Sequence, residues 1–134
     1  MPPAIAPGID LSDGANTSSY DGRGIFTGSV TIVDGIPIAT YPGEVYGGDK
    51  HADNWCEASP ANLSDPLLTV WKKSPLNPLG NDTTMKTTGG PLGCTAAWKE
   101  PSGNWTTTIQ SNRYAAGELL SGALPPSERV GLRT

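Results

Sequence analysis

The chain has 134 residues, enough for one ordinary domain, and carries a net charge of −4. Its few lysines and arginines are scattered, which argues against a nucleic-acid groove, and no apolar run approaches the roughly 20 residues of a transmembrane helix. The 17 glycines and 13 prolines are spread along the chain, so long helices are disfavoured and short strands joined by turns are favoured.

The opening segment, "MPPAIAPGID", has neither a basic start nor an apolar stretch, so we do not expect it to be a signal peptide. Four glycosylation sequons nevertheless occur, beginning at Asn16, Asn62, Asn81 and Asn104. They are compatible with a secreted or vacuolar parent protein and do not establish one.

Residues 24–41, "GIFTGSVTIVDGIPIATY", predict a β-hairpin. Both limbs are rich in β-branched and aromatic residues, and Asp34-Gly35 lies between them. Asp-Gly readily adopts the positive φ angles of a two-residue hairpin turn.

Residues 47–57, "GGDKHADNWCE", contain the only histidine of the chain together with other side chains that can bind metals. Asp49, His51 and Asp53 alternate and would share one face of a strand, with Cys56 and Glu57 nearby. No standard metal spacing is met, so we favour a solvated loop and predict neither a metal nor another cofactor.

The next stretch, residues 55–71, has the character of a scaffold. We expect Asp65 to accept backbone hydrogen bonds within its turn, and Leu67, Leu68 and Trp71 to anchor the loop to a sheet. A short strand is predicted within "LLTVWKK".

A second hairpin is predicted over residues 94–110, with the turn at 101–104. Trp98 and Trp105 flank this turn closely enough to pack on or near each other. The following segment, 111–134, loses the alternating pattern, and both a short helix near 115–121 and disorder fit it; we assign it no function.

The two cysteines, Cys56 and Cys94, allow two readings. They could form a disulfide in an oxidising compartment, but two buried thiols are favoured because no export signal is visible.

Three stretches in order resemble the invertase (β-fructofuranosidase) group of glycoside hydrolases, family 32. These are "PPAIAPG" followed by "SYDGRGIFTGSVTI", then "PANLSDPLLTVWKKSPLNPL", and finally "TAAWKEPSGNW". Together they cover residues 2 to about 110, and the specificity lies in their combination and order.

The resemblance implies an all-β fold, the five-bladed β-propeller of that family, in an incomplete form. At some forty residues a blade, this chain supplies about two to three four-stranded blades. We therefore expect a partial propeller at 1–110 with a tail at 111–134. The implied function is that of a fragment or degenerate copy of a hydrolase that releases fructose from sucrose or fructans.

The resemblance also suggests that the catalytic carboxylates are missing. In the family the nucleophilic Asp precedes the "PPAIAP" segment and the acid/base Glu belongs to a later Glu-Cys motif, which the reversed Cys56-Glu57 does not match. Leu92, Gly93 and Cys94 stand where the family has Arg-Asp-Pro, whose Asp holds sugar hydroxyls. We predict no catalytic residue and no activity in this chain alone.

By the same resemblance, Phe26, Thr27 and Ser29 belong to the wall of the sugar pocket, and the expected ligand is a fructose-containing sugar. An equally weighted alternative makes Phe26 a core residue of an alternating strand. The other aromatic residues considered are expected in blade cores: Tyr41, Trp55, Trp71, Trp98 and Trp105.

Two other functional classes stay open. The chain could be a non-catalytic carbohydrate-binding module that keeps Phe26 and Thr27 without the acids. It could also be a purely structural β-rich protein related to the family only by remote descent.

Overall fold

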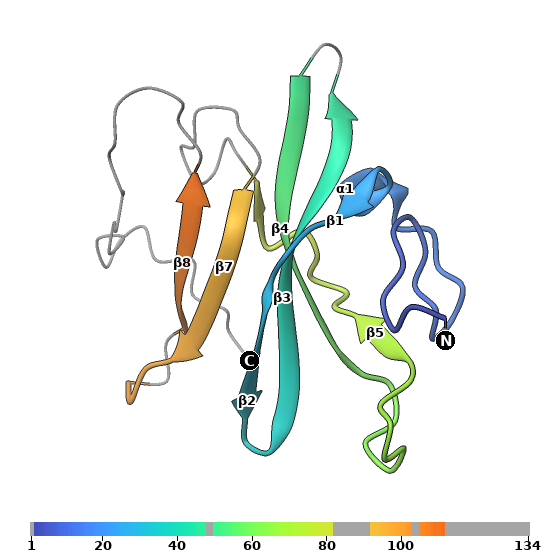
Figure 1. The fold of residues 1–134 in the computed structure, drawn as a ribbon, viewed down its shortest axis with the longest axis vertical. Helices are drawn as coiled ribbons and strands as arrows, with labels where there is room; N and C mark the ends of the chain where they lie inside the picture. Colours follow the sequence, from blue (N-terminus) through green and yellow to red (C-terminus); the bar gives the residue numbers. More distant parts are fainter. Residues whose placement is uncertain (1, 48–49, 82–91, 103–104, 112–134) are drawn as a thin grey trace.

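The computed structural model describes residues 2–47, 50–81, 92–102 and 105–111. Strands dominate this part of the chain, with a single helical turn near the start (Figure 1). The elements are α1 (Ser18–Asp21), β1 (Gly24–Ile25), β2 (Ser29–Val33), β3 (Ile36–Gly47), β4 (Lys50–Pro60), β5 (Trp71–Lys73), β6 (Gly80–Asn81), β7 (Leu92–Lys99) and β8 (Trp105–Ser111).

Six of the strands form one curled antiparallel sheet (Figure 1). The two long strands β3 and β4 lie at its centre; β1 and β2 both pair with the outer edge of β3, and β5 and β6 both pair with the outer edge of β4. The sheet thus has four strand positions, which are occupied in chain order by β1 and β2, then β3, then β4, and last β5 and β6. That meander is the pattern of a propeller blade.

The first predicted hairpin is confirmed. β2 and β3 pair from Ser29↔Thr40 to Val33↔Ile36, and the turn between them consists of Asp34 (φ 50°) and Gly35 (φ 81°). Two successive positive φ angles fit the right-handed twist of the adjoining strands.

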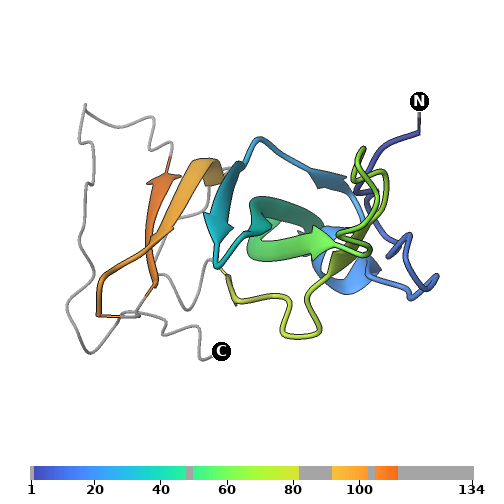
Figure 2. The ribbon, with the colours of Figure 1, turned by 90° about the horizontal axis from the view of Figure 1, so that it is seen from below.

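The second predicted hairpin is also present, as β7 and β8. It packs beside the first, with β7 next to β2 and β3 (Figures 1 and 2). The register pairs Trp98 with Thr106 and Lys99 with Trp105, so the two tryptophans are not opposite each other. The expectation of a core position for Trp98 is wrong: its side chain is 40% exposed, and its Nε1 donates to Glu100.

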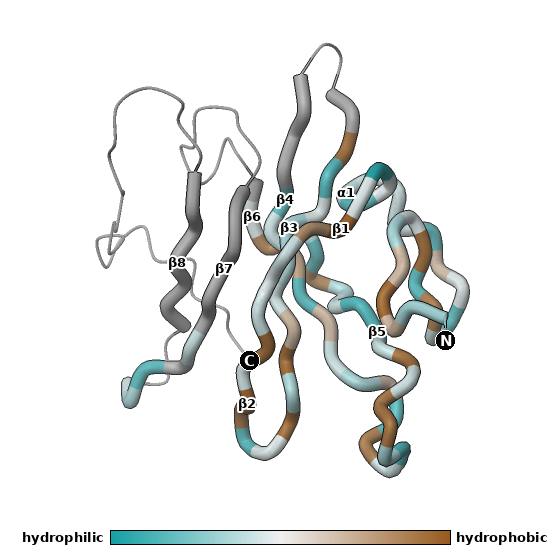
Figure 3. Tube along the Cα trace, viewed as in Figure 1, coloured by the Kyte–Doolittle hydropathy of each residue, from teal (hydrophilic) through white to brown (hydrophobic). Residues whose placement is uncertain are grey.

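The core of the described part is small. One cluster consists of Tyr41, Cys56 and Ala58, with Trp71 packed against its margin, and a second surrounds Trp55. Figure 3 shows that apolar residues are plentiful in the β2–β3 hairpin and in the loop after β4, yet many of them face solvent. The core positions expected for Tyr41 and Trp55 are confirmed, whereas Trp71 is half-buried and packs against the core from its margin.

Asp65 helps to hold the loop between β4 and β5, as expected. Asp65 accepts hydrogen bonds from the amides of Leu67 and Thr69 and from Thr69 Oγ1. The expectation that Leu67 anchors the loop is wrong, because its side chain is 72% exposed. Trp71 does anchor the loop, as expected, since it packs on the core and donates from Nε1 to the Leu68 carbonyl.

Several expectations fall outside the described residues. They concern the side chains of Asp49, His51, Asp53, Cys94 and Trp105, and the segment 112–134. The solvated loop expected over residues 47–57 is wrong, because Lys50–Pro60 is strand β4 and pairs with β3. Cys56 is a buried free thiol. None of the described helices is long and apolar enough to cross a membrane.

Candidate functional site

The connection between β1 and β2 presents Phe26 and Thr27 at the surface. Phe26 is 47% exposed and Thr27 is exposed, while the Phe26 amide donates to the Pro42 carbonyl and so ties the connection to β3. The exposure contradicts a core position for Phe26. An exposed aromatic ring beside a hydroxyl can bind a sugar, because a sugar offers apolar C–H faces and polar O–H groups together.

Gly28 brings this connection close to β3. A Cβ at position 28 would lie 1.8 Å from the Thr40 carbonyl oxygen, which no side chain could accommodate without moving the strand. Glycine is therefore required here for close approach of the two backbones.

Ser29 differs from the two residues before it. It begins β2, is half-buried, and its Oγ lies 3.2 Å from Thr40 Oγ1 across the strand pair. Its hydroxyl is thus already engaged within the sheet.

An ion pair lies beside the aromatic ring. Arg23 Nη1 is 2.5 Å from Glu44 Oε1, and the Arg23 amide donates to the Glu44 carbonyl. A Cβ built on Gly24 would touch both the Phe26 ring at 3.4 Å and Glu44 Oε2 at 3.9 Å. The ring and the carboxylate therefore flank the same point on β1, a grouping that the sequence did not predict.

Leu92 and Gly93 begin β7, where they pair with Ser111 and Gln110. A register shift follows, between Gly93 and Ala96. Because β7 packs beside β2, the strand that carries these two residues lies next to the strand that begins at Ser29 (Figures 1 and 2).

The most buried polar cluster surrounds Lys73, and sequence reasoning missed it. Lys73 Nζ lies 2.5 Å from Asp21 Oδ2 and also donates to Thr17 Oγ1 and to the Ala6 carbonyl, at 2.8 and 2.7 Å. Asp21 Oδ1 in turn accepts from the Gly8 amide and from Thr17 Oγ1. The cluster joins the N-terminal segment to β5.

Burial shapes the acid–base chemistry around this pair. It raises the pKa of the Tyr41 hydroxyl well above its usual value, and the Cys56 thiol and Asp21 add to that effect. Burial likewise raises the pKa of the Cys56 thiol, aided by the Asp21 charge. Both groups are neutral at physiological pH, so neither serves as a ready nucleophile or base.

The only sequence signals for this cluster were weak. Asp21 belongs to the Tyr-Asp pair of the first matched stretch, and Lys73 to the sole adjacent pair of lysines. A lysine is rarely buried unless it is paired, and its partner is 52 residues away.

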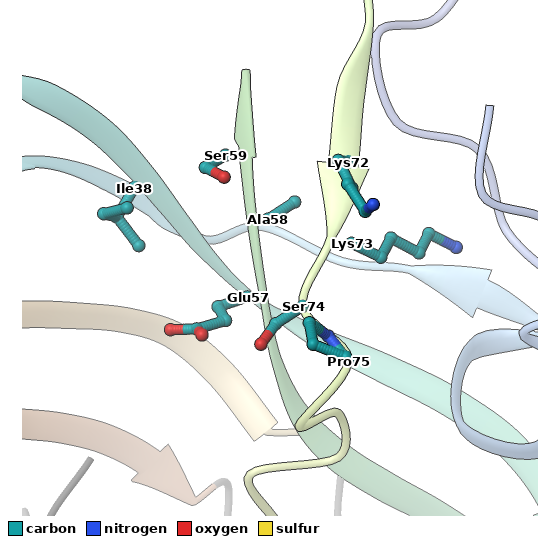
Figure 4. Close-up of a pocket in the computed structure, with 8 residues that line it drawn as sticks. All are labelled: Ile38, Glu57, Ala58, Ser59, Lys72, Lys73, Ser74 and Pro75. Atoms are coloured by element: carbon teal, nitrogen blue, oxygen red, sulfur yellow. The ribbon is translucent and has the colours of Figure 1, made fainter. Parts of the chain in front are cut away.

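A separate hollow of about 150 Å³ lies over β4 and β5 (Figure 4). Its polar lining includes Glu57, Ser59, Lys72 and Ser74, and Ile38 and Pro75 add apolar surface. Among the described residues there is no group of three or more side chains that could hold a metal ion.

Comparison with known proteins gives a consistent set of relatives. The chain is 36% identical over 99 residues to a vacuolar acid β-fructofuranosidase of a Rosa hybrid cultivar, covering 73% of the chain and 16% of the relative. It is 40% identical over 109 residues to a sucrose:sucrose 1-fructosyltransferase of Festuca arundinacea, covering 76% and 16%. The chain thus spans under one fifth of the length of these relatives. No family model matches it.

A solved structure agrees with the sequence matches. Fructan 1-exohydrolase IIa from Cichorium intybus, in complex with 1-kestose, superposes with a TM-score of 0.53 at 30% identity. The match covers 72% of this chain and 18% of that one.

The antiparallel blade and the adjoining hairpin define the chain as part of an all-β, propeller-type glycosidase scaffold. More particularly, it belongs to the invertase group of glycoside hydrolases, family 32, as a partial copy of the propeller domain.

Proposed function

We propose that this chain forms part of the wall of a fructose-binding pocket in a β-fructofuranosidase-type protein, and that it does not cleave the sugar by itself. The observation that carries the proposal is the exposed pair Phe26 and Thr27 on the connection between β1 and β2. Phe26 would contact the C–H face of a fructosyl unit while Thr27 would hydrogen-bond its hydroxyls.

The charges of the described residues support the absence of catalysis. A retaining glycosidase needs two carboxyl groups about 5 Å apart on either side of the scissile bond. Asp21 is fully buried against Lys73, and Glu44 is ion-paired with Arg23, so neither resembles such a catalytic acid. The family resemblance, which aligns the uncharged Leu92 and Gly93 with the Arg-Asp pair that holds the sugar, also supports this part of the proposal.

Binding and turnover are tested separately on the full chain. Calorimetric titration with 1-kestose should give saturable binding, and Phe26→Ala should weaken it at least about tenfold, the effect of losing one good aromatic contact. Phe26→Trp is the matched control and should retain binding, because it keeps an aromatic face.

Each negative result has a specific meaning. If the wild-type chain gives no saturable heat at millimolar 1-kestose, the sugar-binding proposal fails and a purely structural role is favoured. Release of fructose from sucrose or inulin by the purified chain would show that the assignment of no catalytic residue is wrong. Binding without release would agree with a non-catalytic carbohydrate-binding module.

A further inference from the structure

Two charged groups line the hollow over β4 and β5, Glu57 on β4 and Lys72 on β5. Neither the Glu57 carboxylate nor the Lys72 ammonium makes a hydrogen bond or ion pair within the part of the chain that the structure describes, although both line the same hollow. The lining therefore offers a ligand one negative group, the Glu57 carboxylate, and one positive group, the Lys72 ammonium. Neighbouring Lys73 is neutralised by Asp21 on the other side of the sheet.

The strand register explains why these groups gather. Side chains alternate between the faces of a strand, and cross-strand partners share a face. Glu57 and Ser59 therefore lie on one face of β4, and Ser59 pairs with Lys72 on β5. Figure 4 shows the Lys73 side chain extending away from Glu57 and Ser59.

The chemistry of the lining suits a neutral, polyhydroxylated ligand. Glu57 accepts hydrogen bonds, Lys72 donates them, and the hydroxyls of Ser59 and Ser74 can do either. Neighbouring hydroxyls of a sugar are themselves both donors and acceptors, so they can satisfy all four groups. The half-buried Ile38 adds an apolar side for sugar C–H groups.

We propose that this hollow is a second saccharide-binding site that accepts one monosaccharide unit through Glu57, Lys72 and Ser59. It is separate from the pocket wall formed by Phe26 and Thr27. Phe26 is tied to Pro42 at one edge of β3, whereas Glu57 lies on β4 beyond the other edge, opposite Thr40. The two places are therefore about two strand spacings apart, roughly 10 Å. A single sugar unit cannot contact both places. This site does not depend on the function proposed for the wall.

The test is an NMR titration of the isotope-labelled full chain with fructose and, separately, with 1-kestose. We expect saturable shifts of the Ser59 and Lys72 amide resonances. Glu57→Gln and Lys72→Met should each weaken this response about tenfold, as expected for one hydrogen bond to a charged group. Phe26→Ala should leave it unchanged, and Asp13→Asn, which removes an exposed carboxylate elsewhere, is the matched control.

The outcomes separate the two sites. Loss of the Ser59 and Lys72 shifts in Phe26→Ala would assign all sugar binding to the wall and overturn the second site. Absence of saturable shifts in the wild-type chain, or their persistence in both Glu57→Gln and Lys72→Met, would also overturn it. Glycine is the competing probe, and shifts with this zwitterion but not with the sugars would reassign the hollow to amino-acid-like ligands.

Discussion

At the scale of single residues, the dominant feature is a buried ion pair rather than an apolar contact. The side chains of Lys73 and Asp21 are 2% and 0% exposed, and each makes further hydrogen bonds that offset its loss of hydration. Buried pairs add modest net stability, but removal of one partner leaves a charge uncompensated. The pair therefore makes the protein sensitive to changes at either position.

Replacing Lys73 by methionine should be strongly destabilising. Lys73→Met retains the length of the side chain but leaves Asp21 without its cation, so we expect the free energy of unfolding to fall by about 3–5 kcal/mol in urea denaturation. Lys72→Met is the matched control, since Lys72 is exposed and unpaired among the described residues, and should change stability by about 0.5 kcal/mol or less. Equal effects of the two substitutions would contradict the assignment.

Asp10 should make stability depend on pH. Burial opposes ionisation, but hydrogen bonds from Ser12 and the Lys73 amide, together with the Lys73 charge, lower the Asp10 pKa below its ordinary 3.8. The unfolded chain then binds a proton more readily than the folded one, so this stabilisation is complete above pH 3.8 and disappears as the pH falls through the lower folded-state pKa.

The measurement compares wild type with Asp10→Asn by urea denaturation at pH 6 and at progressively lower pH. The difference in unfolding free energy should be largest at pH 6 and should shrink below about pH 4. Asp13→Asn controls for the loss of one surface carboxylate. A difference that is constant with pH would show that the charge of Asp10 does not contribute to the pH dependence of stability.

At the scale of elements, the connection between β1 and β2 determines where the sugar-facing residues lie. Gly28→Ala should push this connection off β3, because the added Cβ would overlap the Thr40 carbonyl. We expect a loss of about 1–3 kcal/mol or more in unfolding free energy, together with weaker 1-kestose binding. Gly24→Ala is the matched control: its Cβ meets only ordinary contacts of 3.4 Å and longer, so stability should change little.

The elements also show what can be predicted from sequence and what cannot. Both hairpins follow from local chemistry, namely alternating β-branched residues around Asp34-Gly35 and around the turn after Lys99. Leu67 could not be placed in this way, because its neighbour Trp71 fills the available position on the core. The Lys73–Asp21 pair and the Glu57–Lys72 hollow arise only when β4 and β5 pair, which no local pattern specifies.

At the scale of the whole molecule, one blade and part of a second form an open surface. Val30 and Ile32 are 59% and 65% exposed, on the side of β2 that carries neither Ser29 nor Val33. A complete propeller covers such faces by packing blades on one another. The family resemblance predicted the all-β class and its incompleteness correctly, because the matched stretches include whole strands and their turns.

The long separation between Asp21 and Lys73 has a consequence for biosynthesis. During translation the acidic partner leaves the ribosome 52 residues before the basic one, and until then the Asp21 carboxylate lacks its Lys73 partner. Contacts between distant parts of a chain form late and slowly. The nascent N-terminal segment therefore completes its structure only when β5 has been made, and a ribosome that stalls earlier exposes an unfinished blade.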